Sequence, residues 1–561
     1  MKSSDQRQAS LDFGEPEPQA PSAASKPAPP APGSTRLPPA PVRGHARRAT
    51  AESMAERQRD ISVSEFFSKN RHLLGFDNPQ KALLTAVKEA VDNSLDACEE
   101  AGILPDLLIE IRQLSETRFV MGVEDNGPGI VKAQIPKIFG KLLYGSKFHT
   151  LKQSRGQQGI GISAAGMYGQ LTSGKPTRIW SRTGPDKPAH HYEIRIDTRK
   201  NAPAVVRDEK VDWARPHGTR VEIEMEGTFK KGRRSVDDYV QQTALANPHA
   251  SIRYTNPAGE EVVYERAALE LPVEPREIRP HPYGVELGML HRIIHESSAG
   301  SLRSALQREF SRVSEKVSTE ILGKAGLSGE LRPRNVSMVD AEGLMRAVQQ
   351  VKIMAPPTTC LSPIGEELIL SGMRARLKAD FYTSTSRPPA VYRGNPFQIE
   401  VGLAYGGELP AEEPMELFRV ANRAPLQYQQ SACAIFRAAL TTDWRNYGLQ
   451  QPKGSLPVGP VALFVHMASV WVPFTSESKE AIAHYPEIIR EMRLGIQECA
   501  RRLASHVRHR RRQVEESKKR SYIEKFIPHI GVALQEILAL TDRQQREVVV
   551  VLTDTLQRSR G

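Results

Sequence analysis

Residues 83–98, LLTAVKEAVDNSLDAC, constrain the fold more than any other stretch of this sequence. The apolar residues recur at steps of three and four, the spacing of one helix face; they are Leu84, Val87, Val91, Leu95 and Cys98. Asn78 and Pro79 precede the run and fit an N-cap followed by proline in the first helical turn. The pattern therefore predicts an amphipathic helix with a defined start.

The opposite face of this predicted helix carries Glu89, Asp92, Asn93 and Asp96. Glu89 and Asn93 are one helical turn apart, so their Cβ atoms lie about 5–6 Å from each other. A carboxylate that can polarise water is thus placed beside an amide oxygen that can bind a hard cation. Taken alone, the same residues also fit an acidic helix face in solvent.

The composition is that of a soluble chain with several domains. Of the 561 residues 39% are hydrophobic, and the length suggests three or four domains. No apolar run approaches the roughly 18–20 residues of a membrane span, and the Pro-rich start lacks the signal-peptide pattern. Four scattered cysteines argue against disulfides and a zinc site, so we expect a cytoplasmic, nucleoid-associated protein. The net charge of +12 favours a polyanionic partner.

Residues 1–55 are rich in Pro, Ala and Ser and are predicted to be disordered, because they cannot bury enough apolar area to offset the entropy of ordering. Within them Gln8, Leu11 and Phe13 have a spacing that resembles peptides docking on the bacterial replication sliding clamp. This prediction assumes a bacterial source, and a chance match of three positions is the alternative.

Two turn-rich segments lie beside predicted strands and helices. An apolar strand in FVMGVEDNGPGI (119–130) runs into turn formers, where Asp125 could accept a hydrogen bond from a base or sugar. Gly156, Gly159 and Gly161 precede an apolar helix, and exposed N–H groups at such a place suit phosphates. The segment matches neither a Walker A loop nor a dinucleotide fingerprint. Each segment alone also fits an ordinary turn.

Apolar and polar residues alternate with a period of two at 107–114, 177–182, 190–198 and 219–226, which predicts strands there. His217-Gly218-Thr219 stands at the start of the last one. Helices are predicted at 64–70 and 428–440, and residues 235–256 are expected to form a helix and a strand. Later strands are predicted at 392–407, 418–426 and 461–474, followed by a long helix from near Pro486. The fold class is therefore α+β.

Four of these motifs, in this order, resemble the GHKL ATPase module shared by gyrase, the ninety-kilodalton heat-shock chaperone, sensor histidine kinases and mismatch-repair MutL. They are the helix with Glu89 and Asn93, EDNGPGI, the lid sequence RGQQGIG and HGT. The resemblance implies a Bergerat-type α/β sandwich. Segments at 279–294, 355–369 and 471–483 narrow it to the B subunit of type IIB DNA topoisomerase, topoisomerase VI.

The resemblance also implies the domains. They are a disordered tail (1–55), the ATPase domain (56–278), a helix–two-turn–helix domain (279–357), a transducer domain (358–525) and a helical C-terminal tail (526–561). In the insert, residues 303–331 would be followed by a helix at 340–351. The long C-terminal helix carries a basic stretch at 501–520, which is either solvated or in contact with DNA or a partner subunit.

ATP and Mg²⁺ are the cofactors that the resemblance implies. Glu89 would act as general base or orient the attacking water, and Asn93 would hold Mg²⁺. Asp125 would accept the adenine amino group with support from Thr219, and Gly129 would leave room for the base.

The phosphates would be covered by a lid, and its residues are Gly156, Gln157, Gln158, Gly159, Ile160 and Gly161. Lys479 of the transducer would reach the terminal phosphate and couple the state of the nucleotide to the angle between domains.

The implied activity is ATP-driven dimerisation that gates double-strand passage, relaxing and decatenating DNA. The chain has no DxD step and no tyrosine in a DNA-binding context, so cleavage is assigned to a separate A subunit in an A2B2 heterotetramer. A chaperone or mismatch-repair relative, a sensor kinase and a non-enzymatic B-like protein are the alternatives. The segments at 279–294 and 355–369 argue against a chaperone or mismatch-repair relative. The missing membrane span argues against a sensor kinase, and intact Glu89 and Asn93 argue against a non-enzymatic protein.

Overall fold

The structure is a computed structural model that describes residues 54–55, 58, 61–146, 150–156 and 159–558. Nearly all of the predicted disordered tail, with Gln8, Leu11 and Phe13, lies outside these residues, and so do the predicted lid residues Gln157 and Gln158. Within the described ranges, no helix is both long enough and apolar enough to cross a membrane.

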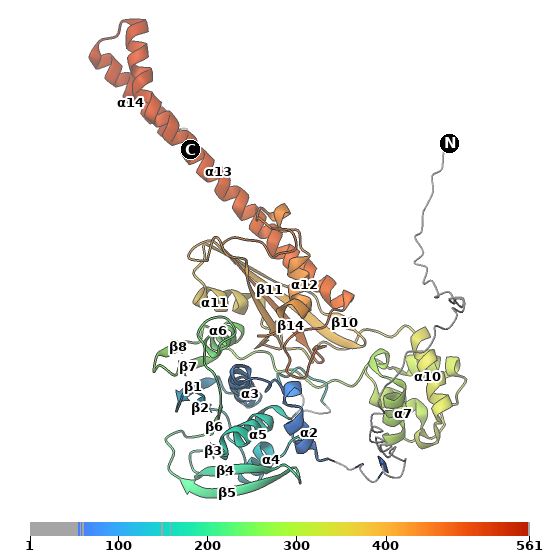
Figure 1. Ribbon diagram of the computed structural model, residues 1–561. Coiled ribbons are helices and arrows are strands. Elements are labelled where there is room, and N and C mark those ends of the chain that lie inside the picture. Colours follow the sequence, from blue (N-terminus) through green and yellow to red (C-terminus); the bar gives the residue numbers. More distant parts are fainter. Residues whose placement is uncertain (1–53, 56–57, 59–60, 147–149, 157–158, 559–561) are drawn as a thin grey trace, which may run out of the picture. The chain divides into compact units, whose positions relative to one another are not determined.

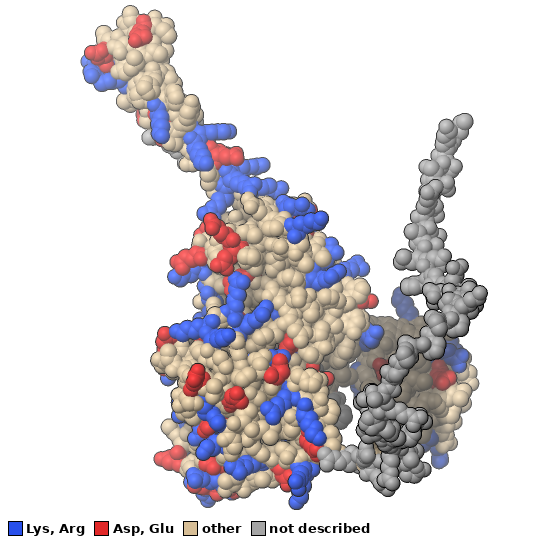
Figure 2. Space-filling view, viewed as in Figure 1, with Lys and Arg blue, Asp and Glu red and all other residues tan. Residues whose placement is uncertain are grey.

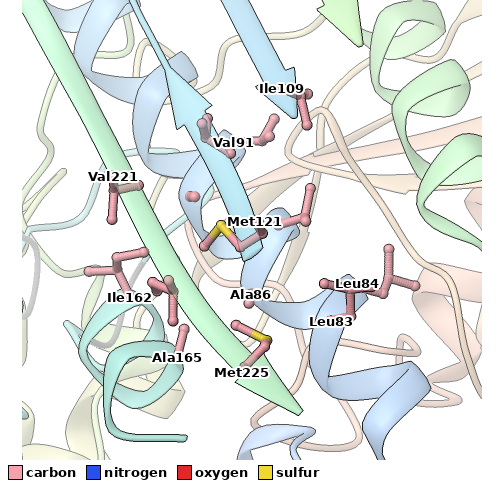
Figure 3. Close-up of a cluster of buried hydrophobic side chains, with 14 of the residues drawn as sticks. Leu83, Leu84, Ala86, Val91, Ile109, Met121, Ile162, Ala165, Val221 and Met225 are labelled. Carbon is pink, nitrogen blue, oxygen red and sulfur yellow. The ribbon is translucent and has the colours of Figure 1, made fainter. Parts of the chain in front are cut away.

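The helix predicted at 83–98 is α3 (Pro79–Glu100), and its start is capped as the sequence indicates. The Asn78 side chain accepts a hydrogen bond from the backbone N–H of Lys81, and Pro79 takes the first turn, where no N–H is needed. The apolar face packs against β2 (Arg118–Glu124) and β6 (Gly218–Glu226). Figure 3 shows this core, which includes Leu83, Leu84, Val91, Met121, Val221 and Met225.

The first sheet has the strand order β5-β4-β3-β6-β2-β1-β7-β8, and its pairs are antiparallel except for the parallel pair β1 and β7. The remaining strands are β1 (Asp106–Gln113), β3 (Thr177–Arg182), β4 (Ala189–Asp197), β5 (Ala202–Val211), β7 (Ser251–Thr255) and β8 (Glu261–Tyr264). Helices α3, α4 (Ile135–Gly140) and α5 (Gly161–Ser173) pack against it (Figure 1), and α6 (Val236–Ala246) packs on α3.

Two strands of this sheet were not predicted. Both β5 and β8 lie at its edges, and most of their residues are exposed on both faces. An edge strand of this kind lacks the apolar alternation from which strands are predicted. The helix predicted at 64–70 is α2 (Val63–Lys69), whose N-cap is Ser62.

Residues 285–353 fold around a separate small core. Their helices are α7 (Leu287–Glu296), α8 (Leu302–Glu309), α9 (Glu315–Ala325) and α10 (Met338–Gln350). Ser301, Ser314 and Ser337 cap the last three with side-chain hydrogen bonds to backbone N–H groups. All four helices lie within residues 279–357, where the resemblance implies the helix–two-turn–helix domain.

The second sheet has the order β10-β11-β14-β12-β13, with β9 also paired to β11. Its strands are β9 (Phe381–Ser386), β10 (Ala390–Tyr392), β11 (Asn395–Tyr405), β12 (Glu416–Ala421), β13 (Ala424–Pro425) and β14 (Val461–Ser469). The helices around it are α11 (Glu366–Arg376), α12 (Ala434–Leu440) and α13 (Pro486–Leu538). Short 3₁₀ turns occur at Arg71–Leu74, Lys132–Gln134, Pro282–Gly284, Pro333–Asn335, Gln430–Ala432 and Trp444–Tyr447.

Several predicted boundaries here were wrong. The strand predicted at 392–407 begins at Asn395, because Arg393 and Gly394 adopt positive φ and turn the chain from β10 into β11. The strand predicted at 418–426 is a hairpin of β12 and β13, reversed at Asn422 and Arg423, which also have positive φ. Arginine rarely takes this conformation, so these turns were not recognised from the residues alone. The predicted strand at 461–474 ends at Ser469, and the helix predicted from 428 begins at Ala434.

The long C-terminal helix α13 begins at the expected Pro486 and runs unbroken through position 525, with Pro528 inside it. The last helix, α14 (Asp542–Arg558), packs back on α13 (Figure 1). Figure 2 shows Lys and Arg side chains along α13, and those at Arg508, Arg510, Arg511 and Arg512 are exposed.

Candidate functional site

A cavity of about 540 Å³ lies between α3, β2, β6 and the start of α5. Residues 477–479, which follow β14, line one side of it. Folding brings together in this cavity all the predicted site residues that the structure describes, namely Glu89, Asn93, Asp125, Gly129, Gly156, Gly159, Ile160, Gly161, Thr219 and Lys479. These residues span most of the folded sequence, yet they line one site.

Asp125 lies at one end of the cavity, at the carboxyl end of β2, and is buried. One carboxylate oxygen accepts a hydrogen bond from Ser94 Oγ at 2.9 Å, and the other accepts from the backbone N–H groups of Gly127 and Thr219 at 2.9 and 3.1 Å. Burial raises the pKa of Asp125, and these donors oppose the rise. The carboxylate is therefore held rigidly and is able to accept a further hydrogen bond.

Gly129 turns the chain beside Asp125, with φ of 71°. A Cβ at this position would overlap the carbonyl oxygen of Arg182, so only glycine fits both the conformation and the space. Gly129 itself lines the cavity.

Glu89 lines the cavity and is half-buried, with its carboxylate against Gly161. Gly161 is the first residue of α5, and a side chain there would overlap the carboxylate. Asn93 is one turn further along α3, is exposed and faces Gly156. A carboxylate, an amide oxygen and a helix N-terminus therefore meet at one point, an arrangement suited to water, a cation and phosphates respectively.

Lys479 is supplied by the loop after β14, and its side chain is buried. The ammonium group donates a hydrogen bond at 3.0 Å to the carbonyl of Arg155, which precedes Gly156. Its backbone has φ of 52°, an uncommon conformation for a residue with a side chain, and such strain occurs often at functional sites.

Two of the four residues on the polar face of α3 are withdrawn from solvent. Asp92 and Asp96 are 2% and 6% exposed. Asp96 accepts a hydrogen bond from Arg155 Nη1 at 2.8 Å, whereas one oxygen of Asp92 has no hydrogen-bond partner among the described residues. Burial raises the pKa of Asp92 to about 6, against the attraction of Lys88. Tyr239 of α6 contacts Asp92 and Arg155 contacts Asp96, so the solvated interpretation of these two residues was wrong.

Two family models match separate parts of the chain. Residues 78–226 match the histidine kinase-, DNA gyrase B- and HSP90-like ATPase, and residues 356–520 match the topoisomerase VI B subunit transducer. The type 2 DNA topoisomerase 6 B subunit of Methanococcoides burtonii is 51% identical over 492 residues, which cover 87% of this chain and 79% of that protein. The chain belongs to the family of type 2 DNA topoisomerase 6 B subunits.

Other members of this family show similar sequence identity to this chain and similar coverage of it. The B subunit of Methanosarcina acetivorans is 50% identical over 489 residues, covering 87% of this chain and 79% of its own. That of Archaeoglobus fulgidus is 47% identical over 486 residues, covering 86% and 80%. These matches confirm the predicted family. They also confirm the predicted α+β fold, which has a GHKL ATPase domain, a transducer and a long C-terminal helix. The chain is the ATPase subunit of a type II DNA topoisomerase, and the chaperone, mismatch-repair and sensor-kinase alternatives are wrong.

The two matched regions contribute unequally to the cavity of this topoisomerase 6 protein. The ATPase region supplies most of the lining, and the transducer region supplies Glu477, Ser478 and Lys479. Ser94 was not among the residues predicted for the site, although its place one residue after Asn93 on the same helix was a usable signal. Arg423, which contacts the helix of the site, was not predicted either, and nothing in its local sequence pointed to it.

Proposed function

We propose that this protein binds ATP in the cavity and hydrolyses it to drive dimerisation, which gates the passage of one DNA duplex through another. Relaxation and decatenation of DNA would then require a separate A subunit that cleaves DNA, in an A2B2 heterotetramer. The observation that carries the proposal is the single cavity lined by Glu89, Asn93, Asp125, the described lid glycines and Lys479.

Adenine recognition is assigned to the Asp125 end. A buried carboxylate that already accepts three hydrogen bonds is fixed in place, so it can accept a hydrogen bond from the exocyclic amino group without rearranging. Thr219, whose backbone N–H donates to Asp125, supports that geometry.

Hydrolysis is assigned to Glu89. Its carboxylate would take a proton from a water molecule while the water oxygen forms a bond to the terminal phosphorus and the bond to the leaving ADP oxygen breaks. General-base catalysis of this kind contributes about 10²–10⁴-fold in rate. The N-terminus of α5, next to Glu89, would favour the negative charge of the phosphates.

Magnesium fits the donors that are present. Asn93 Oδ1 would hold Mg²⁺ together with phosphate oxygens, the mixed ligand set that this ion prefers. When bound, Mg²⁺ neutralises phosphate charge.

Lys479 would pair with the terminal phosphate and so report its presence to the transducer. In the structure its ammonium group, which has three donors, makes a hydrogen bond to the Arg155 carbonyl beside the cavity. A lysine attached to one domain and bound to a phosphate that hydrolysis removes can couple chemistry to domain position.

The decisive experiment mixes the full chain with a purified family A subunit and supercoiled plasmid. We expect relaxation that requires both proteins and ATP, and ATP hydrolysis that DNA stimulates. A chain that binds nucleotide but neither hydrolyses it nor supports relaxation would instead be a non-enzymatic partner of the cleaving protein.

Dimerisation is tested by light scattering with a non-hydrolysable ATP analogue. We expect monomers to become dimers, and removal of residues 1–70 to abolish this change, whereas removal of residues 1–50 leaves it intact. Since α2 (Val63–Lys69) is the first helix among the described residues of the ATPase domain, the longer deletion removes it. A mass that does not depend on nucleotide contradicts the gate.

For the tail, docking on a sliding clamp through Gln8, Leu11 and Phe13 stays a prediction. A peptide of residues 1–20 is expected to bind purified clamp, and the double change Leu11→Ala, Phe13→Ala to eliminate binding. Equal binding of both peptides rejects the motif.

A further inference from the structure

Residues 153–155, which we call the loop stem, lead directly into Gly156 of the site and are bonded to the transducer one after another. Gln153 Nε2 donates a hydrogen bond to the carbonyl of Ser362 at 2.9 Å, and Gln153 Oε1 accepts one from the backbone N–H of Ser362 at 2.7 Å. The carbonyl of Ser154 accepts from Asn422 Nδ2 at 3.0 Å. The next carbonyl, that of Arg155, accepts from Lys479 at 3.0 Å. The transducer therefore holds every residue of the stem.

The side chain of Arg155 is fixed from the ATPase side. Its guanidinium is 1% exposed and donates to both oxygens of Glu99, at 2.7 and 3.0 Å, and to Asp96 at 2.8 Å. Bidentate pairs of this kind are the strongest and most directional of charged hydrogen bonds. Arg155 thus ties the loop stem to α3, the helix that carries Glu89 and Asn93.

Glu99 joins this arrangement to the transducer a second time. It accepts from Arg423 Nη2 at 2.6 Å and from His249 Nε2 at 2.8 Å. Burial opposes ionisation of Glu99, but Arg155 and Arg423 outweigh it and hold its pKa well below the ordinary value. We call Glu99, Asp96, Arg155, His249 and Arg423 the Glu99 cluster.

Arg423 is itself rigidly placed. It lies in the turn between β12 and β13 with φ of 63°, and its backbone N–H donates to His466 Nε2 at 3.0 Å. His466 in turn contacts Glu400 at 2.8 Å inside the second sheet. The Arg423 guanidinium also donates to the carbonyl and hydroxyl oxygens of Ser362, at 2.8 and 2.6 Å. Any movement of the transducer core therefore moves the cation that faces Glu99.

We propose that Arg423 is a positioning residue for ATP turnover, acting through Glu99 and Arg155 on the loop stem. It differs from Lys479, which reaches into the cavity, because Arg423 is not among the residues that line the cavity and touches no substrate. The inference rests on the proposed hydrolysis of ATP. Loss of the Arg423 cation leaves Glu99 paired with Arg155 and His249, so nucleotide still binds. The stem keeps its direct hydrogen bonds with Ser362, Asn422 and Lys479 but loses the link to the transducer that runs through Glu99, so its alignment is weakened.

The test measures steady-state ATP hydrolysis and amide hydrogen exchange in residues 150–156 on the full chain. For Arg423→Ala we expect kcat to fall about tenfold with KM changed by less than about threefold, because small misplacement of a site penalises turnover. A non-hydrolysable ATP analogue should slow exchange in the stem of the unmodified chain and fail to do so in the variant. Arg423→Lys, which keeps the charge but not both bonds to Ser362, should recover part of the turnover.

Arg445→Ala is the matched control, since Arg445 is an exposed transducer arginine paired with Asp443. It should match the unmodified chain in both measurements. A kcat for Arg423→Ala within about twofold of the unmodified chain, with normal protection of the stem, overturns the proposal. If Arg423→Ala does not fold, Arg423→Lys carries the test. If the unmodified chain itself does not hydrolyse ATP, the proposed function fails, and the exchange measurement still decides the role of Arg423.

Discussion

The two ends of the cavity are built differently. At the Asp125 end, every group that fixes the carboxylate belongs to the ATPase region: Ser94 on α3, Gly127 in the turn after β2, and Thr219 in β6. At the other end, Lys479 comes from the transducer, 324 residues after the Arg155 carbonyl that it contacts. On the proposed function, the Asp125 end would take the base and the Lys479 end the phosphates. The base end would then be complete within one domain, whereas the phosphate end would require two.

This difference separates binding from turnover. A site completed by one domain can bind nucleotide whatever the position of the other domain. A site that needs a lysine and a loop stem held from the transducer reaches its working geometry only in one arrangement of the domains. Changes at the two ends should therefore have distinct kinetic signatures.

The largest effect is expected for Glu89→Ala. Without the carboxylate, turnover should fall by about 10²–10⁴-fold, while the dissociation constant for ATP changes little because the base end is intact. Hydrolysis is measured by phosphate release and binding by calorimetry. Glu100→Ala, at the exposed end of the same helix, is the control. Turnover like that of the unmodified chain in Glu89→Ala would remove Glu89 from the mechanism.

Next in size is the effect of Glu99→Gln on stability. Removing one partner of a buried ion cluster destabilises by about 3–5 kcal/mol, since Arg155 and Arg423 are left without their shared anion. The pKa of Glu99 is lowered in the folded state, so its contribution is present above the ordinary value of 4.5 and is lost as pH falls through the folded-state pKa. Urea unfolding should therefore show a difference between the two chains that shrinks on acidification. A difference that is independent of pH would mean that the charge of Glu99 is not what stabilises the cluster.

Asp125→Asn should weaken ATP binding by about tenfold to a hundredfold, which is the loss of affinity expected when a hydrogen bond to a charged group is removed. The turnover of bound ATP should change much less, because the phosphate end is untouched. Calorimetry and saturating kinetics separate the two. The control is Asp106→Asn, at the exposed start of β1. If binding stays normal, the nucleotide base lies elsewhere in the cavity.

The smallest effect on binding and a moderate effect on turnover are expected for Lys479→Ala. ATP should still bind, with hydrolysis lowered about tenfold or more by loss of one charged donor to the phosphates. DNA relaxation by the complex with an A subunit should fall in parallel, and Lys453→Ala, an exposed transducer lysine, should have no effect. Relaxation at the normal rate in Lys479→Ala would show that the switch is not this lysine.

Local sequence was enough to predict α3, the turn at Gly129 and the glycines before α5, because capping, helical spacing and turn chemistry act between near neighbours. The spaced motifs also identified, through resemblance, the residues that line the cavity. Edge strand β5 escaped prediction because it lacks apolar alternation. The turns at Arg393 and Arg423 escaped it because arginine rarely adopts positive φ.

Only the tertiary structure decided which charges are buried. In the sequence, Asp92, Asp96 and Glu99 have the pattern of a solvated helix face, and Arg423 is one of many arginines. Their burial and pairing depend on residues far along the chain. Tyr239 contacts Asp92, Arg155 pairs with Asp96 and Glu99, and Arg423 of the second domain, more than 300 residues later, pairs with Glu99. A long-range ion pair forms between residues that only folding brings together, and its energy depends on their burial in the folded chain. It leaves no local pattern in the sequence, so the Glu99 cluster could be identified only from the tertiary structure.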